Sequence, residues 1–212
     1  MAQTPQERAE LIELMESRKA VYTFLSTAYF EEMTLAFLEG LRNEPVALDG
    51  TLGAFAQSLA NADLAQVRCD LAAEYARLFL NMSRTPIPPY ESVYTSDLHI
   101  LMQDARDEVL ATYRSEGIVV VTEVNIPEDH LALELDFMVK MCQKTIDALV
   151  DGSEDEADRC LDVQAAFVEK HLCNWVPQLC LDVKSRTRQQ FYRGVAELTE
   201  QFIASEAELL AS

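Results

Sequence analysis

Apolar residues recur every three or four positions through most of this chain, and that spacing leaves few folds open to it. The first such run extends from about residue 9 to residue 30, and its apolar members are Leu11, Leu14, Met15, Val21, Tyr22, Leu25, Ala28 and Tyr29. This period is typical of a helix with one face on a core. Thr4, Pro5 and Glu7 have the order of an N-terminal capping box, so the helix is expected to begin beside them.

The same period predicts helices along the rest of the chain. They are expected over residues 33–41, in a segment that ends at residue 59, and then over 64–79, 96–114, 127–149, 154–172, 175–183 and 188–210. The prediction is an all-α fold, a single-domain bundle of about eight to ten helices around one core.

Two segments of this assignment, residues 96–114 and 118–121, carry local signals of their own. In the helix over residues 96–114, Ser96 is the expected N-cap, and Leu98, Leu101 and Met102 are expected to face the core. The β-branched run at residues 118–121 has no partner of similar character elsewhere in the chain. An extended connector is therefore expected there, and a lone short strand is left open.

The length of the chain limits the number of domains, and the spacing of its cysteines indicates their redox state. With 212 residues, 49% of them hydrophobic, it is long enough for one substantial core and short for two, so one domain is predicted over residues 1–212. The five scattered cysteines contain no CxxC pair, which favours reduced, buried thiols. No segment has the apolar length of a secretory signal or a membrane span, so a cytoplasmic location without membrane insertion is predicted.

The formal net charge is −19, and the sequence pI is near 4.4. An acidic surface repels phosphates and offers few cations to displace their counterions, which argues against nucleic acid and anionic membranes as partners. A basic partner is favoured. The alternative is that the charge serves only solubility.

The stretch from Glu74 to Tyr94 combines the end of a predicted helix with a rigid loop that carries Pro86, Pro88 and Pro89. Proline fixes φ and removes a backbone donor, so this loop joins neither a helix nor a central strand. A loop that is stiff beforehand binds an extended peptide with little further loss of freedom. The alternative is a plain connector whose aromatic residues enter the core.

Asp129, His130 and Glu134 gather at the start of the helix that follows residue 127. His130 and Glu134 are four residues apart, hence on one helix face. Carboxylates in such a cluster form paired hydrogen bonds with a guanidinium that an ammonium cannot match. The alternative is a polar pair that fastens the helix start to a neighbouring loop.

No motif for nucleotide, metal or catalytic chemistry is present. The chain contains neither GxxxxGK nor GxGxxG nor HExxH. Cys160, Cys173 and Cys180 with His171 would make a poor zinc set, because His171 and Cys173 project about 200° apart on a helix. No metal, no cofactor and no catalytic residue is predicted, and the chain is not expected to be an enzyme.

Three segments carry motifs that match one known family when taken together. They are YARLF at residues 75–79 with PIPPYESVY at 86–94, PEDHLALELDFM at 127–138, and the segment 167–177 with its HLxxWxP pattern. In combination they closely resemble the TorD/DmsD family of redox-enzyme maturation chaperones. The similarity extends weakly through both terminal helices, so it covers most of the chain.

The resemblance implies an all-helical cytoplasmic chaperone that binds the twin-arginine signal peptide of a molybdenum-cofactor oxidoreductase. Such a chaperone holds the apo form of the molybdoenzyme back from export until the cofactor is inserted. The family includes monomers and domain-swapped dimers, so a homodimer is left open. By motif position, the residues expected to contact the signal peptide are Tyr75, Phe79, Pro86, Pro89, Tyr90, Glu91, Ser92, Tyr94, Asp129, His130 and Glu134.

One alternative to this function is a closely related chaperone, and two belong to other classes. A nitrate-reductase-type assembly chaperone would act on a subunit that is not exported. Weak guanine-nucleotide binding is ascribed to some family members, but the missing phosphate loop argues against a nucleotide-hydrolysing protein here. A purely structural helical scaffold is the third alternative. The leading hypothesis requires the proline loop to lie against the helix start at Asp129 and to share a hollow with it.

Overall fold

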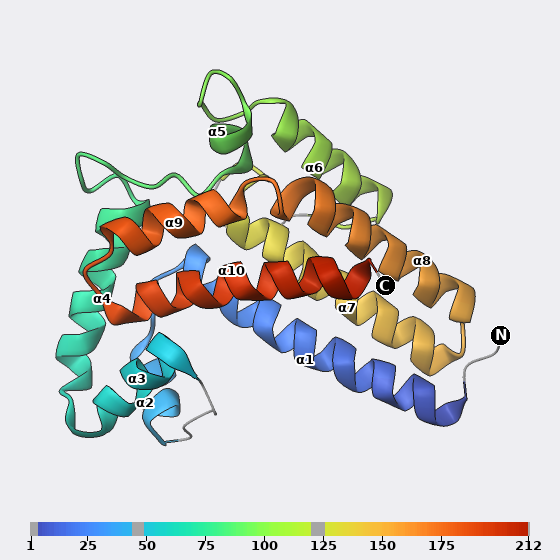
Figure 1. Ribbon diagram of the computed structural model, residues 1–212, viewed down its shortest axis with the longest axis horizontal. Coiled ribbons are helices and arrows are strands. Elements are labelled where there is room, and N and C mark those ends of the chain that lie inside the picture. The colour runs from blue at the N-terminus through green and yellow to red at the C-terminus, as the bar shows by residue number, and fades with distance from the viewer. Residues whose placement is uncertain (1–3, 44–48, 120–125, 212) are drawn as a thin grey trace. The chain divides into compact units, whose positions relative to one another are not determined.

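The computed structural model describes residues 4–43, 49–119 and 126–211. Within these ranges the chain forms ten α-helices, two short helical turns and no strand, which confirms the all-α prediction (Figure 1). The α-helices are α1 (Pro5–Phe30), α2 (Leu35–Asn43), α3 (Gly50–Ser58), α4 (Leu64–Phe79), α5 (Glu91–Thr95), α6 (Asp104–Ser115), α7 (Leu131–Asp151), α8 (Glu154–Phe167), α9 (Val176–Arg186) and α10 (Gln190–Leu210).

The contacts within the chain divide it into two compact units. Unit 1 comprises residues 1–29, 90–175 and 203–212, and unit 2 comprises residues 30–89 and 176–202. Helices α1 and α5–α8 lie in unit 1 with the end of α10, whereas α2–α4, α9 and most of α10 lie in unit 2. The single domain expected over residues 1–212 stays a prediction.

Helix α1 begins as its capping box predicts. The Thr4 backbone N–H donates to Glu7 Oε2 at 2.7 Å, and the Glu7 backbone N–H donates to Thr4 Oγ1 at 3.2 Å. These hydrogen bonds lower the pKa of the Glu7 carboxyl because they favour its ionised form. Helix α4 is also capped by a local side chain, since Asp63 Oδ1 accepts from the backbone N–H groups of Ala65 and Gln66.

The core of unit 1 is built around α7, which lies alongside α8 (Figure 1). A row of aromatic rings lies in this core. Tyr113 stacks on Phe137 with ring centroids 4.9 Å apart. The centroids of Phe137 and Phe167 are 4.5 Å apart, and those of Phe167 and His171 are 4.9 Å apart. A five-residue π turn, Val168–Leu172, follows α8. It replaces the last turns of the α-helix predicted to end at residue 172.

A buried ion pair ties α1 to the end of α10 in unit 1. Arg18 Nη2 donates to Glu206 Oε2 at 2.6 Å, and Arg18 Nε donates to both oxygens of the same carboxylate. The Tyr22 hydroxyl also donates to Glu206 Oε2, at 2.6 Å. Burial outweighs the neighbouring Arg18 charge and raises the pKa of Tyr22 well above its usual value.

A polar network around Glu74 holds part of unit 2 together. Glu74 Oε1 accepts from Arg77 Nη2 at 2.7 Å, from Thr187 Oγ1 at 3.0 Å and from the Arg188 backbone N–H at 2.6 Å. Hydrogen bonds from Arg77, Arg188 and Thr187 lower the pKa of Glu74 against the opposing effect of burial. This network joins α4 to the turn between α9 and α10.

The structure overturns the predicted helix over residues 96–114. Instead, α5 ends at Thr95, residues 96–103 form a loop, and α6 begins at Asp104. Leu98, Leu101 and Met102 are exposed rather than inward-facing. The reason is tertiary: Gln103 N–H donates to Ser92 Oγ at 3.2 Å, which draws the chain back to α5 where a helix would have continued straight.

Two smaller predictions also change. Helix α7 begins at Leu131 and not near Pro127, because His130 is its N-cap and Asp129 is engaged by α5. Of the cysteines, Cys142, Cys160 and Cys180 are buried thiols as predicted, whereas Cys173 is half-buried and Cys69 is exposed. Residues 120–121 of the predicted connector and Asn125 lie outside the described residues.

Candidate functional site

Residues 90–92 lie against the start of α7, within unit 1. Tyr90 and His130 form an antiparallel backbone bridge, and their rings meet edge to face with centroids 4.8 Å apart. Glu91 N–H donates to the Asp129 carbonyl at 3.0 Å, and Ser92 N–H donates to Asp129 Oδ2 at 2.9 Å. Asp129 therefore caps α5 from a distant point of the sequence, since free N–H groups at a helix start attract a carboxylate.

The third motif segment joins the same place through Glu91. His171 Nδ1 lies 2.9 Å from Glu91 Oε2, and Asn174 Nδ2 donates to Glu91 Oε1 at 3.2 Å. The rings of Tyr94 and Trp175 lie 5.4 Å apart. We use the name polar cluster for the residues that meet here, which are Glu91, Ser92, Asp129, His130, Glu134, His171, Asn174 and Trp175.

The acids of the polar cluster are covered by protein. Glu91, Asp129 and Glu134 are all buried, and so are His130 and His171. They do not form the open anionic face that the sequence suggested. Tyr90 and Tyr94 are half-buried, so they are the expected site residues of unit 1 that reach the surface.

Several polar atoms of the polar cluster are left without partners. Among the described residues, neither carboxyl oxygen of Glu134, nor Asp129 Oδ1, nor Trp175 Nε1 makes a hydrogen bond of ordinary geometry. Burial raises the pKa of Glu134 well above its usual value, and the charges of Glu91 and Asp129 raise it further. Proximity to the Trp175 indole opposes this shift only in part. The protonated carboxyl of Glu134 is therefore favoured.

Burial sets the protonation of the two neighbouring groups as well. It raises the pKa of Asp129, although the hydrogen bonds from Ser92 oppose it. It lowers the pKa of His130 to about 4. A neutral His130 fits the geometry, because its Nδ1 accepts from the Ala132 N–H at 3.1 Å, which leaves the ring proton on Nε2.

The other four expected site residues lie in unit 2. Tyr75 and Phe79 are buried, with ring centroids 5.4 Å apart. Pro89 is also buried, and Pro86 is anchored through its carbonyl, which accepts from Arg186 Nη1 at 3.2 Å. This burial and anchoring fit the alternative of a connector, and contact of these four residues with a signal peptide stays a prediction.

The structure adds three members to the cluster that the site prediction left out: His171, Asn174 and Trp175. The signal for them was present, because all three lie in the HLxxWxP segment that carried part of the resemblance. That segment alone does not show that His171 meets a carboxylate 80 residues away.

The described residues contain neither a metal-binding group of side chains nor a membrane-spanning helix. No group of three or more His, Cys, Asp or Glu side chains in residues 4–43, 49–119 and 126–211 is arranged to hold a metal ion. Over the same ranges, no helix has the length and apolar character that crossing a bilayer requires.

Comparison with known proteins places the chain. The family described as nitrate reductase delta subunit matches residues 45–181. The chain belongs to this family. Three similar relatives are each named chaperone protein TorD. That of Photobacterium profundum is 28% identical, with 95% of this chain and 97% of the relative covered. Those of Vibrio cholerae and Vibrio vulnificus are 28% and 27% identical and cover 95% and 92% of this chain, with 95% of each relative covered.

These relatives confirm the predicted likeness to the TorD/DmsD chaperones. Because they are named chaperones, they also confirm the predicted class of protein, a chaperone and not an enzyme. A solved redox enzyme maturation protein from Archaeoglobus fulgidus is 18% identical, with 92% of this chain and 94% of that chain covered and a TM-score of 0.49. That structural likeness is too loose to carry a conclusion.

Proposed function

We propose that this member of the nitrate reductase delta subunit family is a cytoplasmic chaperone for a molybdenum-cofactor oxidoreductase. It binds the twin-arginine signal peptide of that enzyme and holds the apo form until the cofactor is inserted and export follows. The names of the relatives support the chaperone class. The formal net charge of −19 suits a partner led by arginines.

The observation that carries this proposal is the meeting of residues 90–94, 127–134 and 171–175 in unit 1. Hydrogen bonds among buried polar groups make the backbone of such a region rigid. Tyr90 and Tyr94 are therefore held in fixed positions on this rigid part of unit 1. Half-exposed aromatic rings bind a guanidinium on their faces and offer apolar area to neighbouring side chains. In the proposal, Asp129 and Glu91 position these rings.

Titration of a labelled twin-arginine peptide tests the proposal, with a twin-lysine version as the comparison. The arginine peptide is expected to bind more tightly, because a planar guanidinium stacks on tyrosine and an ammonium does so less well. Changing Asp129→Asn together with His130→Asn is expected to weaken binding while leaving the helical content intact, since Asn is itself a good N-cap. Unchanged affinity would remove these two residues from the site.

A second candidate has its own support in the description of the family. Nitrate reductase delta subunit names the family that matches residues 45–181. On this alternative the chain assists assembly of a nitrate reductase subunit that is not exported. Capture of bound clients from native cytoplasm separates the two, because an exported molybdoenzyme carries a twin-arginine leader and a resident nitrate reductase subunit does not.

A further inference from the structure

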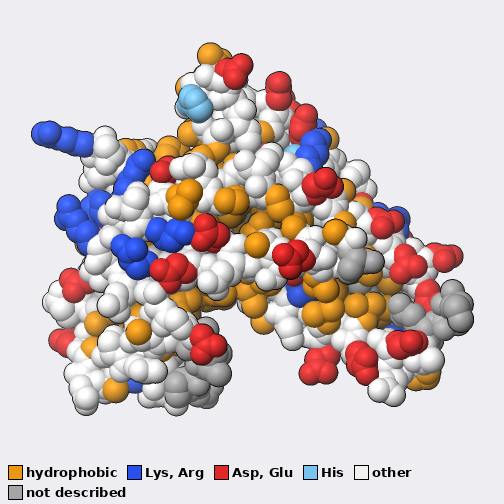
Figure 2. Space-filling model, in the orientation of Figure 1, with side chains coloured by type: hydrophobic (Ala, Val, Ile, Leu, Met, Phe, Trp, Pro, Cys, Tyr) orange, Lys and Arg blue, Asp and Glu red, His pale blue; other side chains and the backbone are white. Residues whose placement is uncertain are grey.

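The loop between α5 and α6, at the top of Figure 1, exposes a row of large apolar side chains. Their exposed fractions are 67% for Leu98, 52% for Ile100, 41% for Leu101 and 57% for Met102. Figure 2 shows hydrophobic and acidic side chains together at this projection. Four exposed large apolar side chains within five consecutive residues are unusual, because exposed apolar side chains are ordinarily scattered singly, and a local concentration of them favours a place where another molecule binds. We call residues 96–103 the apolar loop.

The apolar loop is held in an uncommon backbone conformation. His99 and Met102 have φ values of +52° and +63°, a region that side-chain-bearing residues rarely adopt. Hydrogen bonds attach the loop to α5: Ser96 N–H donates to the Ser92 carbonyl at 3.2 Å, His99 Nδ1–H donates to the Val93 carbonyl at 2.9 Å, and Gln103 N–H donates to Ser92 Oγ at 3.2 Å. Backbone strain of this kind persists where the surrounding contacts enforce it, and it collects at binding sites.

These attachments connect the loop to the polar cluster. Ser92 binds Asp129 through its N–H and Gln103 through its hydroxyl. Gln103 is also tied to the loop itself, because its Nε2 donates to the carbonyls of Leu101 and Met102. The buried contacts of Asp129 therefore fix the end of the loop from which the apolar side chains project.

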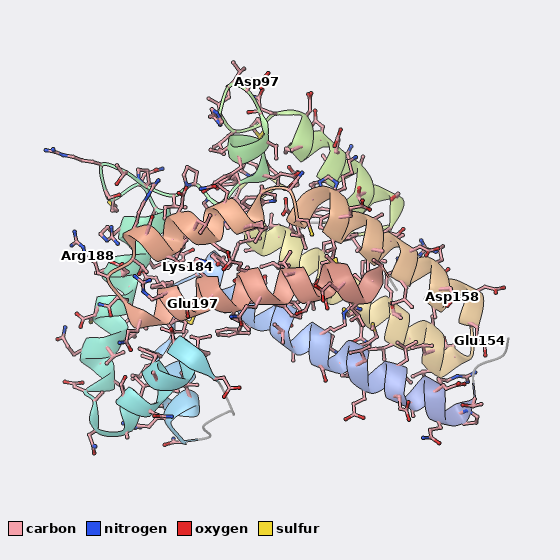
Figure 3. All side chains as sticks on the ribbon, in the orientation of Figure 1. Asp97, Glu154, Asp158, Lys184, Arg188 and Glu197 are labelled. Carbon is pink, nitrogen blue, oxygen red and sulfur yellow. The ribbon has the colours of Figure 1, made fainter. Side chains whose placement is uncertain are left out.

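An acidic hollow of about 360 Å³ lies beside the apolar side chains. It is lined by Thr95, Ser96, Asp97, Leu98, Gln103, Asp104 and Ala105. Asp97, at the tip of the loop in Figure 3, and Asp104 are exposed, and neither forms an ion pair with any described residue. The Ser96 hydroxyl is buried and lacks a hydrogen-bond partner among those residues. Two free carboxylates and an unused hydroxyl suit a group rich in N–H donors.

We propose that the apolar loop and the acidic hollow together bind a peptide segment in which a basic side chain is followed by apolar residues. The basic side chain enters the hollow between Asp97 and Asp104, and the apolar residues cover Leu98, Ile100 and Met102. This inference rests on the proposed function, because a twin-arginine signal has that order of residues. Charge selects this occupant over a second copy of the chain, which carries a formal charge of −19 and is repelled.

Fluorescence anisotropy with a labelled synthetic peptide, an arginine pair followed by a leucine and alanine stretch, tests the apolar part. The variant Leu98→Ser with Met102→Gln is expected to raise Kd about tenfold or more, because it removes apolar area that the peptide covers. The matched control is Leu80→Ser with Met82→Gln in unit 2, where the side chains are 50% and 75% exposed. That control is expected to leave Kd unchanged.

The acidic part is tested with a second peptide that carries glutamines in place of the arginine pair. Asp97→Asn with Asp104→Asn is expected to raise Kd severalfold for the arginine peptide and to leave Kd for the glutamine peptide unchanged. Asp155→Asn with Asp158→Asn, a change of equal charge on the exposed face of α8 (Figure 3), is the control. Equal losses for the two peptides would overturn the assignment of the hollow.

The outcomes separate this inference from the proposed function. If the native chain binds the arginine peptide and the Leu98→Ser, Met102→Gln variant binds it equally well, the loop assignment is wrong and the proposed function stands. If the native chain binds no such peptide, both are wrong. Amide exchange of the native chain adds a readout that needs no variant, since bound peptide must protect residues 96–103. A variant that alters only self-association in sedimentation would instead assign the loop to an interface between copies.

Discussion

The carboxyl of Glu134 sits in a place that favours its neutral form. It is buried, lacks a hydrogen-bond partner of ordinary geometry among the described residues, and has Glu91 and Asp129 close enough to oppose its charge. A buried charge without a partner is strongly disfavoured, so the proton stays on this group to a higher pH than in the unfolded chain. The polar cluster thus depends on one proton that the sequence does not reveal.

Replacing Glu134 by Gln is expected to change how stability depends on pH. The folded pKa of Glu134 lies above the unfolded value, so its stabilising effect is present at low pH and lost as pH rises through the folded pKa. From the ordinary carboxyl pKa of 4.5 up to the folded pKa, the native chain should lose about 1.4 kcal/mol of unfolding free energy per pH unit relative to Glu134→Gln, because the contribution of His130 is the same in both. Urea unfolding of both chains at a series of pH values above about 5 measures this, and parallel profiles would contradict the raised pKa.

His130 contributes with the opposite sign on the acid side. Its folded pKa, about 4, lies below the unfolded value, so the unfolded chain takes up a proton first as pH falls. As pH falls from about 6.5 to about 4, the native chain is therefore expected to lose stability relative to His130→Asn, which keeps an N-cap acceptor but does not titrate. The contribution of Glu134 is the same in both chains. Thermal melts of both at pH 7 and pH 5 give the measurement, and an equal change in the two would contradict the assignment.

The Arg18–Glu206 pair is buried and closely hydrogen-bonded. Glu206→Ala leaves a buried guanidinium unpaired, and the unfolding free energy is expected to fall by about 3–5 kcal/mol. Glu108→Ala, which removes the exposed partner of Lys170, is the matched control and should lower it by less than about 1 kcal/mol. Denaturant titration of both variants measures the difference, and similar losses would mean that burial of the pair has no effect.

Helix α10 approaches α3 so closely that only glycine fits at one point. A Cβ on Gly194 would lie 2.7 Å from Leu52 Cγ and 2.8 Å from the Leu52 backbone nitrogen. Gly40, within α2, has open space around it. Both glycines lie within helices, but only Gly194 is closely packed against another helix. Substituting each in turn therefore distinguishes the effect of helix propensity from the effect of packing.

Gly194→Ala is expected to destabilise the chain by about 1–3 kcal/mol, because the backbone of α3 must shift to admit the methyl group. Gly40→Ala is expected to stabilise it by about 0.5–1 kcal/mol, since alanine has the higher helix propensity and meets no obstacle. Chemical denaturation compares the two substitutions. Stabilisation by both would show that α10 and α3 do not pack as described.

For the chain as a whole, the charge balance makes peptide binding sensitive to salt. The affinity for a twin-arginine peptide is expected to fall severalfold as ionic strength rises from about 0.01 M to about 0.15 M, because the screening length shortens from about 30 Å to about 8 Å. A peptide with glutamines in place of the arginines should respond little. Equal responses of the two peptides would assign the salt effect to something other than charge attraction.

Most of the helices can be predicted from local patterns along the chain. The capping box of Thr4 and Glu7 was readable because its hydrogen bonds join residues three positions apart. The apolar period is equally local, so the all-α class followed from it. Helix α7 was found from the same pattern, although its start was placed early.

Three features follow from folded contacts and not from local patterns: the end of α5, the outward direction of the apolar loop, and the burial of the acids of the polar cluster. These outcomes depend on contacts between distant residues: Ser92 with Asp129 across 37 positions and His171 with Glu91 across 80. A local pattern contains no information on such partners. At residues 96–103, the hydrogen bonds of His99 to Val93 and of Gln103 to Ser92 outweighed the helical period. Burial likewise depends on what packs above a residue, which is why carboxylates expected at a surface lie inside.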